Sequence, residues 1–268
     1  MKIVVVCICL ILTAFISNAT NIAKAPDAPA LLKTENLINP IAVDDVHPRF
    51  SWIHKSLERG WKQSAYQIIV SSSKANIDAN IGELWNTGKV INAAQTSIRY
   101  AGAALTEGSK YWWKVRVYDK NGKISSYSSS ATFEIGRLNW NSSAWIGGDY
   151  NLLRDEIVLD PAKSIASARV YIASLGWNEV YINGKKVGDD VLNTGYTELD
   201  KRVLYATYDV KHLLTSSKNG IGIWLGGGTY TKFVCPALGI PYQKAARLEI
   251  HVTYTDGTQY SYGTNPDQ

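Results

Sequence analysis

Cysteine is scarce in this sequence: there are three, and two of them lie at the very N-terminus. Cys7 and Cys9 lie in an apolar N-terminal run, which leaves Cys235 as the only cysteine beyond it. A single thiol cannot close an internal disulfide, so stability must come from buried apolar surface. Because Val234 and Pro236 flank Cys235, we expect an inert thiol in the core.

The sequence also lacks the motifs of several enzyme classes. Gly226-Gly227-Gly228 follows a predicted strand but precedes neither a helical pattern nor Lys-Ser/Thr, which excludes a P-loop and a dinucleotide fingerprint. There is no Gly-x-Ser-x-Gly elbow. No metal-ligand spacing links the four histidines, which are His47, His54, His212 and His251. Nucleotide, serine-hydrolase and histidine-metal chemistry are therefore not indicated.

Runs of like charge are absent as well. Removing Lys2 from the 28 basic residues leaves 27 against 23 acidic ones, a net charge of +4 that is spread along the chain. Such a surface is solvated throughout and lacks the basic patch that binds nucleic acid. We therefore expect no nucleic-acid partner.

Only one long apolar run is present, and it lies at the N-terminus. Lys2 precedes the apolar stretch from Ile3 to Ile16, and the small residues of Ser17-Asn18-Ala19 follow. This pattern predicts a signal peptide over residues 1–19, too short for a confident membrane span. The remaining 268 − 19 = 249 residues contain no second such stretch, so we expect an exported chain, periplasmic or extracellular, with no membrane span.

What dominates the rest of the sequence is period-two alternation. In the run YWWKVRVY from Tyr111 to Tyr118, aromatic and aliphatic residues form one face, and Lys114 and Arg116 lie on the other. That is the pattern of a half-buried strand. The same pattern predicts strands over 49–53, 65–70, 168–173, 179–182, 203–208, 220–225 and 248–254. With no helical pattern longer than a turn or two, an all-β chain is expected.

Turn chemistry separates these runs. Asn183-Gly184 and Asp256-Gly257 tolerate the positive φ of a two-residue hairpin, and Asn121-Gly122 is similar. The alternation breaks over residues 136–143, which predicts two β-sandwich domains at 25–136 and 144–268. Short strands with regular turns favour an immunoglobulin-like or fibronectin type III sandwich for the first. Longer strands and Gly-rich loops favour a jelly-roll, galactose-binding-like sandwich for the second.

Blocks of sequence in each half carry a family resemblance. The first half contains RFSW at 49–52, QSAYQI at 63–68, LWNTGKV at 84–90 and YWWKVRVYD at 111–119. The second contains LRDE at 153–156, LGWNEVYINGKKVG at 175–188, YT at 196–197, KRVLYATYDV at 201–210 and LGGG at 225–228. In this order they resemble the fibronectin-like module and the N-terminal jelly-roll domain of bacterial α-L-rhamnosidases.

The resemblance implies a glycoside hydrolase whose inverting reaction takes place in a large downstream (α/α) barrel. No segment here corresponds to that barrel, so we expect the non-catalytic N-terminal part of an exported rhamnosidase-like enzyme. Its role would be to position the enzyme or to bind rhamnose-containing polysaccharide or glycoside. The second domain is expected to be truncated at its C-terminus, where the family continues with a further strand. Tyr196 and Thr229 stand where the family has tryptophans, a departure that weakens a tryptophan-based sugar platform there.

Neighbouring acidic residues do not supply a glycosidase pair. Hydrolysis needs two carboxyls about 5 to 9.5 Å apart across the sugar. In an extended chain the members of Asp44-Asp45, Asp155-Glu156 and Asp189-Asp190 point to opposite faces. No catalytic residue is therefore predicted, and the chain is expected to be inactive alone.

Sugar binding needs an aromatic face and a few planar polar groups. The candidates, in loops or at strand ends of the second domain, are Tyr196, Asp200, Arg202, Trp224 and Tyr230. Each also has a purely structural interpretation. Trp177 and Tyr181 lie in the most regular hairpin, where packing in the core is expected instead.

A cluster of oxygen-bearing side chains follows one predicted strand. Asp189, Asp190 and Asn193 supply three oxygen ligands, which is part of the shell that calcium requires. The resemblance adds to this, since some similar rhamnose-binding modules use calcium. The alternative is an ordinary polar turn.

Three other functions stay open. The chain is consistent with a free carbohydrate-binding protein, with a structural spacer, or with the front sandwich of a β-mannosidase-like or β-galactosidase-like enzyme. The block at 202–210 argues against the last. If a strand is missing from the second domain, an unpaired sheet edge should make that domain marginally soluble on its own.

Overall fold

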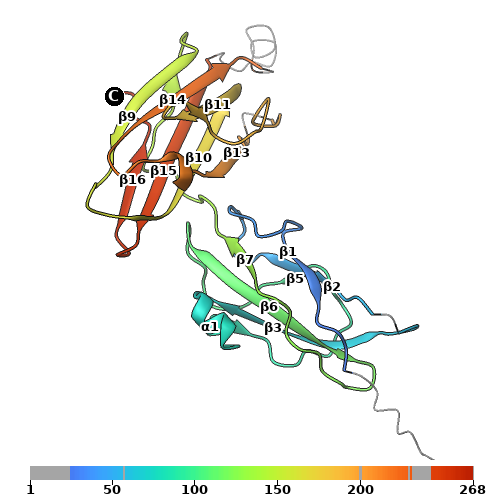
Figure 1. Ribbon diagram of the computed structural model, residues 1–268. Coiled ribbons are helices and arrows are strands. Elements are labelled where there is room, and N and C mark those ends of the chain that lie inside the picture. The colour runs from blue at the N-terminus through green and yellow to red at the C-terminus, as the bar shows by residue number, and fades with distance from the viewer. Residues whose placement is uncertain (1–24, 57, 199–200, 229, 231–242, 268) are drawn as a thin grey trace, which may run out of the picture.

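The alternating runs form strands, and the strands pack as two β-sandwiches. The computed structural model describes residues 25–56, 58–198, 201–228, 230 and 243–267, so the predicted leader over 1–19, Asp200, Thr229 and Cys235 lie outside the described residues. Figure 1 shows the sandwiches joined end to end, with β7 (Ala131–Glu134) leading from the first toward the second. Helix in the described part is confined to α1 (Lys74–Asp78) and the 3-10 turn η1 (Lys211–Leu213), neither of which has the length and apolarity to span a bilayer.

The first sandwich consists of two antiparallel sheets. One has the order β1-β2-β5, and the other β4-β3-β6-β7. Their bounds are β1 Ala30–Thr34, β2 Arg49–Ile53, β5 Ile98–Arg99, β4 Trp85–Asn86, β3 Gln63–Ser71 and β6 Lys110–Asp119. The predicted strands over 49–53, 65–70 and 111–118 are confirmed as β2, β3 and β6.

An aromatic cluster joins the two sheets of this sandwich. Trp113 of β6 is fully buried, and its ring centroid lies 4.4 Å from that of Phe50 on β2. The Phe50 ring also packs 5.6 Å from Phe133 of β7. The indole Nε1 of Trp113 donates a hydrogen bond of 3.1 Å to Oγ1 of buried Thr34, so its polar atom is satisfied. The predicted apolar face of β6 is thus the core face.

Lys114 departs from the expected pattern. The alternation places it on the solvent face of β6, but the residue is buried, with 7% exposed. Its ammonium lies 5.3 Å from the centroid of the Tyr127 ring, a cation–π contact that partly replaces water. Burial lowers the pKa of Lys114. A helical turn, α1, contacts β3 and β6 and buries Ile77 completely, so the first sandwich is covered where sequence alone predicted solvent.

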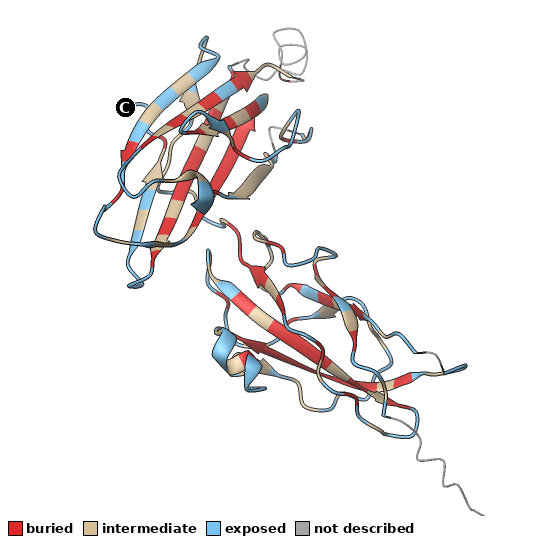
Figure 2. Cartoon of the chain, viewed as in Figure 1, coloured by how far each residue is buried: buried red, intermediate tan, exposed pale blue. Residues whose placement is uncertain are grey.

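The second sandwich has larger sheets. One has the order β13-β10-β15-β16, with β8 also paired to β15, and the other β12-β11-β14-β9. Their bounds are β13 Tyr205–Asp209, β10 Ile165–Leu175, β15 Ala245–Tyr254, β16 Gln259–Gly263, β8 Ile146–Gly147, β12 Lys185–Lys186, β11 Trp177–Ile182, β14 Lys218–Gly226 and β9 Leu152–Val158. Figure 2 shows the buried residues of both sandwiches along the strands and the exposed ones mainly in the loops. The four strands predicted over 168–173, 179–182, 220–225 and 248–254 are confirmed, and the one over 203–208 is confirmed with its start shifted to Tyr205.

Two hairpins test the turn predictions. Asn183 and Gly184 have φ of 52° and 77° and connect paired Ile182 and Lys185, which confirms the two-residue turn. Gly257 also has positive φ, 83°, but the Tyr254 amide donates to the Thr258 carbonyl at 2.9 Å. The second hairpin therefore has a three-residue loop with glycine at its left-handed position, and the expectation of two residues was wrong.

The packing of β6 makes a stability prediction. Trp113→Ala removes a fully buried ring and should lower the free energy of unfolding of the first domain by about 3–5 kcal/mol in urea titrations. Its neighbour Trp112 lies on the opposite, partly exposed face, so Trp112→Ala is the matched control and should cost at most half as much. Equal losses for the two variants would contradict the assignment of the core face.

Candidate functional site

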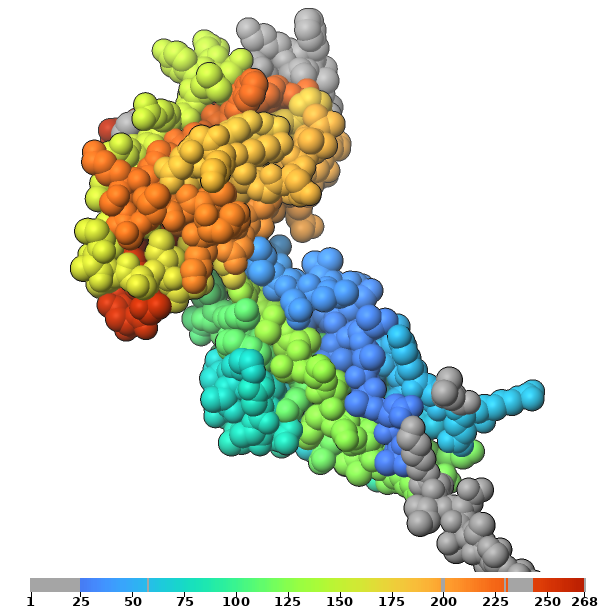
Figure 3. Space-filling view, in the orientation of Figure 1, coloured from blue at the N-terminus to red at the C-terminus, as the bar shows by residue number. Residues whose placement is uncertain are grey.

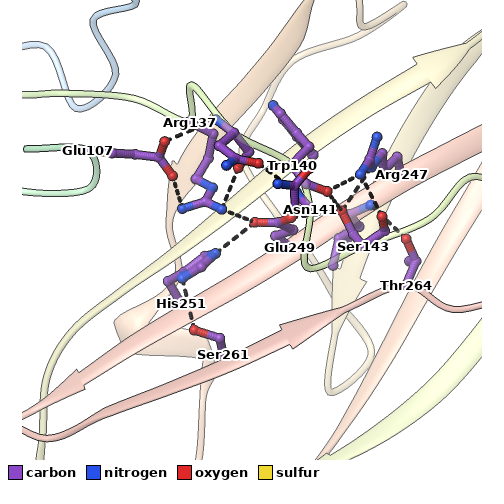
Figure 4. A network of polar contacts seen from close by, with 12 residues as sticks. Glu107, Arg137, Trp140, Asn141, Ser143, Arg247, Glu249, His251, Ser261 and Thr264 are labelled. Atoms are coloured by element: carbon purple, nitrogen blue, oxygen red, sulfur yellow. Dashed lines mark hydrogen bonds and ion pairs between the residues drawn. The ribbon is translucent and has the colours of Figure 1, made fainter. Parts of the chain in front are cut away.

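The segment after β7 crosses from one sandwich to the other and carries an arginine whose side chain is only 13% exposed. Arg137 forms ion pairs with Glu107 of the first domain and, at 2.8 Å from Nη2 to Oε2, with Glu249 of β15. Its backbone amide donates 3.1 Å to the Tyr205 hydroxyl, which in turn donates to the Asp44 carboxylate. Figure 4 shows Arg137 between the two carboxylates of Glu107 and Glu249. One side chain thus bonds to both domains.

Glu249 is the most deeply buried acid of this network. Its side chain is 0% exposed and accepts hydrogen bonds from Ser143 Oγ at 2.8 Å and from His251 Nε2 at 2.9 Å. Burial alone would raise the pKa of Glu249, but the hydrogen bonds from His251 and Ser143 and the charge of Arg137 outweigh it and lower the pKa. The carboxylate is therefore held ionised in the seam, which is the boundary between the two sandwiches.

A second arginine, Arg247, bonds β15 to the linker, the segment that connects the two sandwiches. Arg247 donates from Nε to Ser143 Oγ at 2.9 Å and from Nη2 to the Ser143 carbonyl at 2.5 Å, and it also donates to the Trp140 carbonyl. Thr264 Oγ1 donates 2.7 Å to the Ala144 carbonyl. The connection between the domains is thereby bonded along its length, as Figure 4 shows.

A third arginine joins strand to strand across the seam. Arg169 of β10 makes a two-pronged contact with Glu134 of β7, with both N–O distances at 2.8 Å, and pairs with Asp209 at 2.9 Å. Arg169 and Glu134 are 12% and 7% exposed in their side chains. A planar guanidinium that bridges two carboxylates in a fork sets direction as well as distance. Figure 3 shows the two domains meeting over a waist narrower than either domain.

A hollow with a volume of about 860 Å³ lies in this seam. Its acidic lining residues are Glu107, Glu134 and Asp209, and each is paired with Arg137 or Arg169. A glycosidase acid requires a carboxyl whose pKa is raised, opposite a second carboxyl. Carboxylates held in ion pairs instead suit a joint that fixes the orientation of two domains.

Sequence reasoning missed this network, although the sequence carries a signal for it. Glu134, Arg169 and Glu249 each interrupt a strand whose neighbours are apolar on both sides or nearly so. A charged residue inside a buried run needs a partner of opposite charge. That rule identifies the three residues, but not which of them pair.

The predicted sugar-binding residues that the structure describes come from different segments of the second domain. Tyr196 is 67% exposed in the segment between β12 and β13, and Trp224 of β14 is 53% exposed. Tyr230 is only 4% exposed. Arg202 lines a hollow of about 530 Å³ that also contains Ile38 of the first domain. Asp200 lies outside the described residues, so a shared site for the five remains a prediction.

Trp177 and Tyr181 are not in the core, contrary to the expectation for this hairpin. On β11 it is Asn178, Val180 and Ile182 that are buried, and the alternate residues face outward. Trp177 is 37% exposed, and the Tyr181 hydroxyl donates 2.7 Å to Glu179, which pairs with Lys186 at 2.7 Å. The charge of Glu179 marks this row as the solvent face. The outer surface of β11 and β14 therefore displays exposed indoles.

The geometry of the possible calcium residues favours a turn. Tyr208 donates from its hydroxyl to Asp190 Oδ2 at 2.8 Å and accepts from Asn193 Nδ2 at 2.9 Å. The Asn193 carbonyl is occupied by the Asn178 amide at 2.7 Å. In the described residues no cluster of three or more His, Cys, Asp or Glu is arranged to hold a metal ion. Asp190 and Asn193 thus converge on a phenol, as the side chains of a polar turn do, and a calcium site with Asp189 stays a prediction.

Comparison with protein families matches both domains. Residues 29–139 match the family model for the "Rha78A-like, N-terminal immunoglobulin domain", and residues 163–267 match the "Alpha-L-rhamnosidase N-terminal domain". An α-L-rhamnosidase of Formosa agariphila is 32% identical over 84% of this chain and 27% of its own length. One of Alteromonas sp. (strain LOR) is 32% identical over 89% of this chain and 28% of its own length.

Solved structures of the same family have the same fold. The α-L-rhamnosidase of Dictyoglumus thermophilum is 37% identical with a TM-score of 0.82, over 90% of this chain and 29% of that one. The Streptomyces avermitilis enzyme, solved in complex with L-rhamnose, is 19% identical with a TM-score of 0.82, over 90% of this chain and 40% of that one. The chain spans 27–28% of the length of the two curated relatives described above. It belongs to the α-L-rhamnosidase family, of which it contains the N-terminal region: an immunoglobulin-like domain followed by the rhamnosidase N-terminal domain.

Proposed function

We propose that this chain is the non-catalytic front portion of an exported α-L-rhamnosidase-like glycoside hydrolase and that it positions the enzyme on rhamnose-containing glycans. Its partner within the enzyme is a catalytic domain that follows it. The proposal includes the domain limits 25–136 and 144–268, removal of a leader over 1–19, and a periplasmic or extracellular location. The resemblance of both domains to α-L-rhamnosidases supports the enzyme class.

The observation that carries the positioning role is the joint between the domains. Arg137 and Arg169 each bridge carboxylates from both sides of the seam. Buried ion pairs contribute little net stability, but a misaligned seam leaves a buried charge without its partner, which costs about 3–5 kcal/mol. One mutual orientation is therefore strongly preferred over others. A front portion of fixed shape is what a positioning role requires.

A surface for the catalytic domain is available on the second sandwich. Trp224 is paired in register with Leu152 of β9, which is 70% exposed. Together with Trp177 these residues form an exposed apolar row on one sheet face. Contiguous exposed apolar residues mark interaction sites. The row supports a protein partner at this face.

A free glycan-binding module is the second candidate. The exposed rings of Tyr150, Tyr196 and Trp224 favour it, since amphipathic rings pack on sugar faces. A purely structural spacer is the third, and it predicts no retention on any glycan.

Replacing one arginine of the joint between the domains should let the two domains adopt a wider range of orientations. Arg169→Met leaves Glu134 buried without its guanidinium, so we expect a loss of about 3–5 kcal/mol in unfolding free energy. We also expect a wider distribution of interdomain distances in X-ray scattering. Lys218→Met, which breaks an exposed pair with Glu156, is the control and should change neither. An unchanged distance distribution in Arg169→Met would contradict the positioning role.

The joint should also weaken in acid. The folded pKa of Glu249 lies below its ordinary 4.5, so its contribution to stability is complete above that value and is lost as the pH falls through the folded pKa. Unfolding free energies measured from neutral pH downward should decline in wild type and decline less in Glu249→Gln. Glu198→Gln, on the exposed surface, should follow wild type. Parallel curves for Glu249→Gln and wild type would rule out this role for Glu249.

Two assays separate the proposal from its rivals. The purified chain should not hydrolyse an aryl α-L-rhamnoside, and it should be retained on a rhamnose-rich glycan column but pass through a rhamnose-free one. Turnover that survives further purification would overturn the non-catalytic assignment. If the chain passes freely through both columns, glycan binding by this chain is excluded. The positioning role, which depends on the joint between the domains, is not affected by that result.

A further inference from the structure

The outer face of the β3–β6 pair in the first domain carries a polar hollow that lies apart from the joint between the domains. Its volume is about 660 Å³, and side chains of β3, β4, β6 and the segment after β6 line it. Lys114 and Arg116 of β6 are the charged residues of the described lining. The others are amides, serines and Tyr127, so the hollow has a positive charge.

Two like charges share one aromatic ring in this hollow. The Lys114 ammonium lies 5.3 Å from the centroid of the Tyr127 ring, and the guanidinium carbon of Arg116 lies 4.7 Å from the same centroid. The ring attracts each cation. It does not neutralise their charge, and the two cations repel each other. The arrangement is therefore costly unless an anion joins it.

No carboxylate of the described chain supplies that anion. Asp78 of α1 is the acid whose charge acts on Lys114, but Lys74 binds its carboxylate at 2.5 Å. Within the residues that the structure describes, neither Lys114 nor Arg116 forms an ion pair. Lys114 is only 7% exposed, and burial lowers its pKa because an ammonium is costly away from water.

Hydrogen bonds occupy the amide oxygens beside these cations. Gln67 Oε1 accepts from Arg116 Nε at 2.9 Å and from its Nη2 at 2.7 Å. Gln67 Nε2 then donates to Asn86 Oδ1 at 2.8 Å, and that oxygen also accepts from the Gly88 amide at 3.0 Å. The series of bonds runs in one direction and ends on the amide nitrogen of Asn86, which is a donor.

The groups that these bonds leave over are donors. Arg116 uses two N–H groups on Gln67 and keeps the rest of its guanidinium fork. The Ser128 hydroxyl accepts from the Val115 amide at 3.2 Å, which leaves its own proton for another acceptor. The Lys114 ammonium adds further N–H groups. Charged and neutral donors around one hollow have the chemistry that binds the oxygens of an anion.

We infer that this hollow binds a tetrahedral oxyanion, a sulfate or phosphate group, between Lys114 and Arg116. Both cations donate to the anion, and Ser128 and Asn86 donate to its remaining oxygens. A doubly charged group balances the two cations, and its oxygens point in several directions, as the donors do. A carboxylate carries one charge and fewer oxygens, so it binds more weakly. The inference is independent of the role proposed above for the joint and for glycans.

The test is a titration of the chain, labelled with ¹⁵N, with sodium sulfate. Sodium chloride is replaced as sulfate is added, so that the ionic strength stays constant. The Nε–H signal of Arg116, assigned from its loss in Arg116→Lys, should shift and saturate. Inorganic phosphate should give a similar saturable shift, and acetate should bind at least several-fold more weakly than sulfate.

A variant of the buried lysine locates the site. Lys114→Met replaces the ammonium by an uncharged chain of similar length and should weaken sulfate binding about tenfold, equivalent to about 1.4 kcal/mol. Without sulfate, its melting temperature should equal or exceed that of wild type, because a buried unpaired charge is removed. Lys163→Met is the matched control. Lys163 lies 5.4 Å from the Tyr254 ring but pairs with Asp256 at 3.3 Å, so this variant loses the same charge and should bind sulfate as wild type does.

The source of the oxyanion is tested with glycerol 3-phosphate. Affinity equal to that of inorganic phosphate supports a site for a phosphate or sulfate ester on a larger molecule, and affinity at least tenfold lower supports a site for the free ion. A wild-type signal that does not saturate with sulfate overturns the site. Equal sulfate affinity of Lys114→Met and wild type overturns it as well. Acetate that binds as tightly as sulfate overturns the assignment to a tetrahedral anion, and that comparison requires no variant of Lys114.

Discussion

A carboxylate that is buried between two domains needs a positively charged side chain beside it. Glu249 sits in the middle of β15 with no exposed side-chain surface, and Glu134 is nearly as buried at the end of β7. Neither is stable there without a guanidinium. Arg137 and Arg169 reach them from the linker and from β10, so the position of the first sandwich on the second depends on two ion pairs. An apolar seam would bind as well but would permit sliding, because the hydrophobic effect is not directional.

Strand pattern and hairpins were predictable because they depend on local rules. Successive side chains of a strand point to opposite faces, so the sequence pattern predicts the strands. The pair Asn183-Gly184 accepts positive φ at both turn positions, which predicts the hairpin. The faces were harder to assign. In β11 both rows contain large residues, and the row with Trp177 and Tyr181 was expected inside. Glu179, on the same row, decides the question, because it pairs with Lys186 on the solvent face and a carboxylate is costly to bury in an apolar core.

The junction was not predictable, since its pairs join residues far apart in sequence. Arg169 and Glu134 are 35 positions apart, and Arg247 and Trp140 are 107 apart. The strand pattern identifies charged residues within apolar strands. It does not show which of Glu107, Glu134 and Glu249 pairs with a given arginine. Whether the sugar candidates share one site is open for the same reason. Loop residues such as Tyr196 and Arg202 have positions set by tertiary packing and not by period.

The joint between the domains and a cleft of about 460 Å³ in the second domain share one piece of chain. Arg247 holds the Trp140 and Ser143 carbonyls, Thr264 holds the Ala144 carbonyl, and Trp145 follows directly at the mouth of the cleft. Thr264 also lines that cleft. Glu249 and Arg247 both lie on β15, and they bond to Arg137 and to the linker residues Trp140 and Ser143. The strand that receives the interdomain ion pair therefore also fixes the linker, so the linker and the joint are held by one element of the second sandwich.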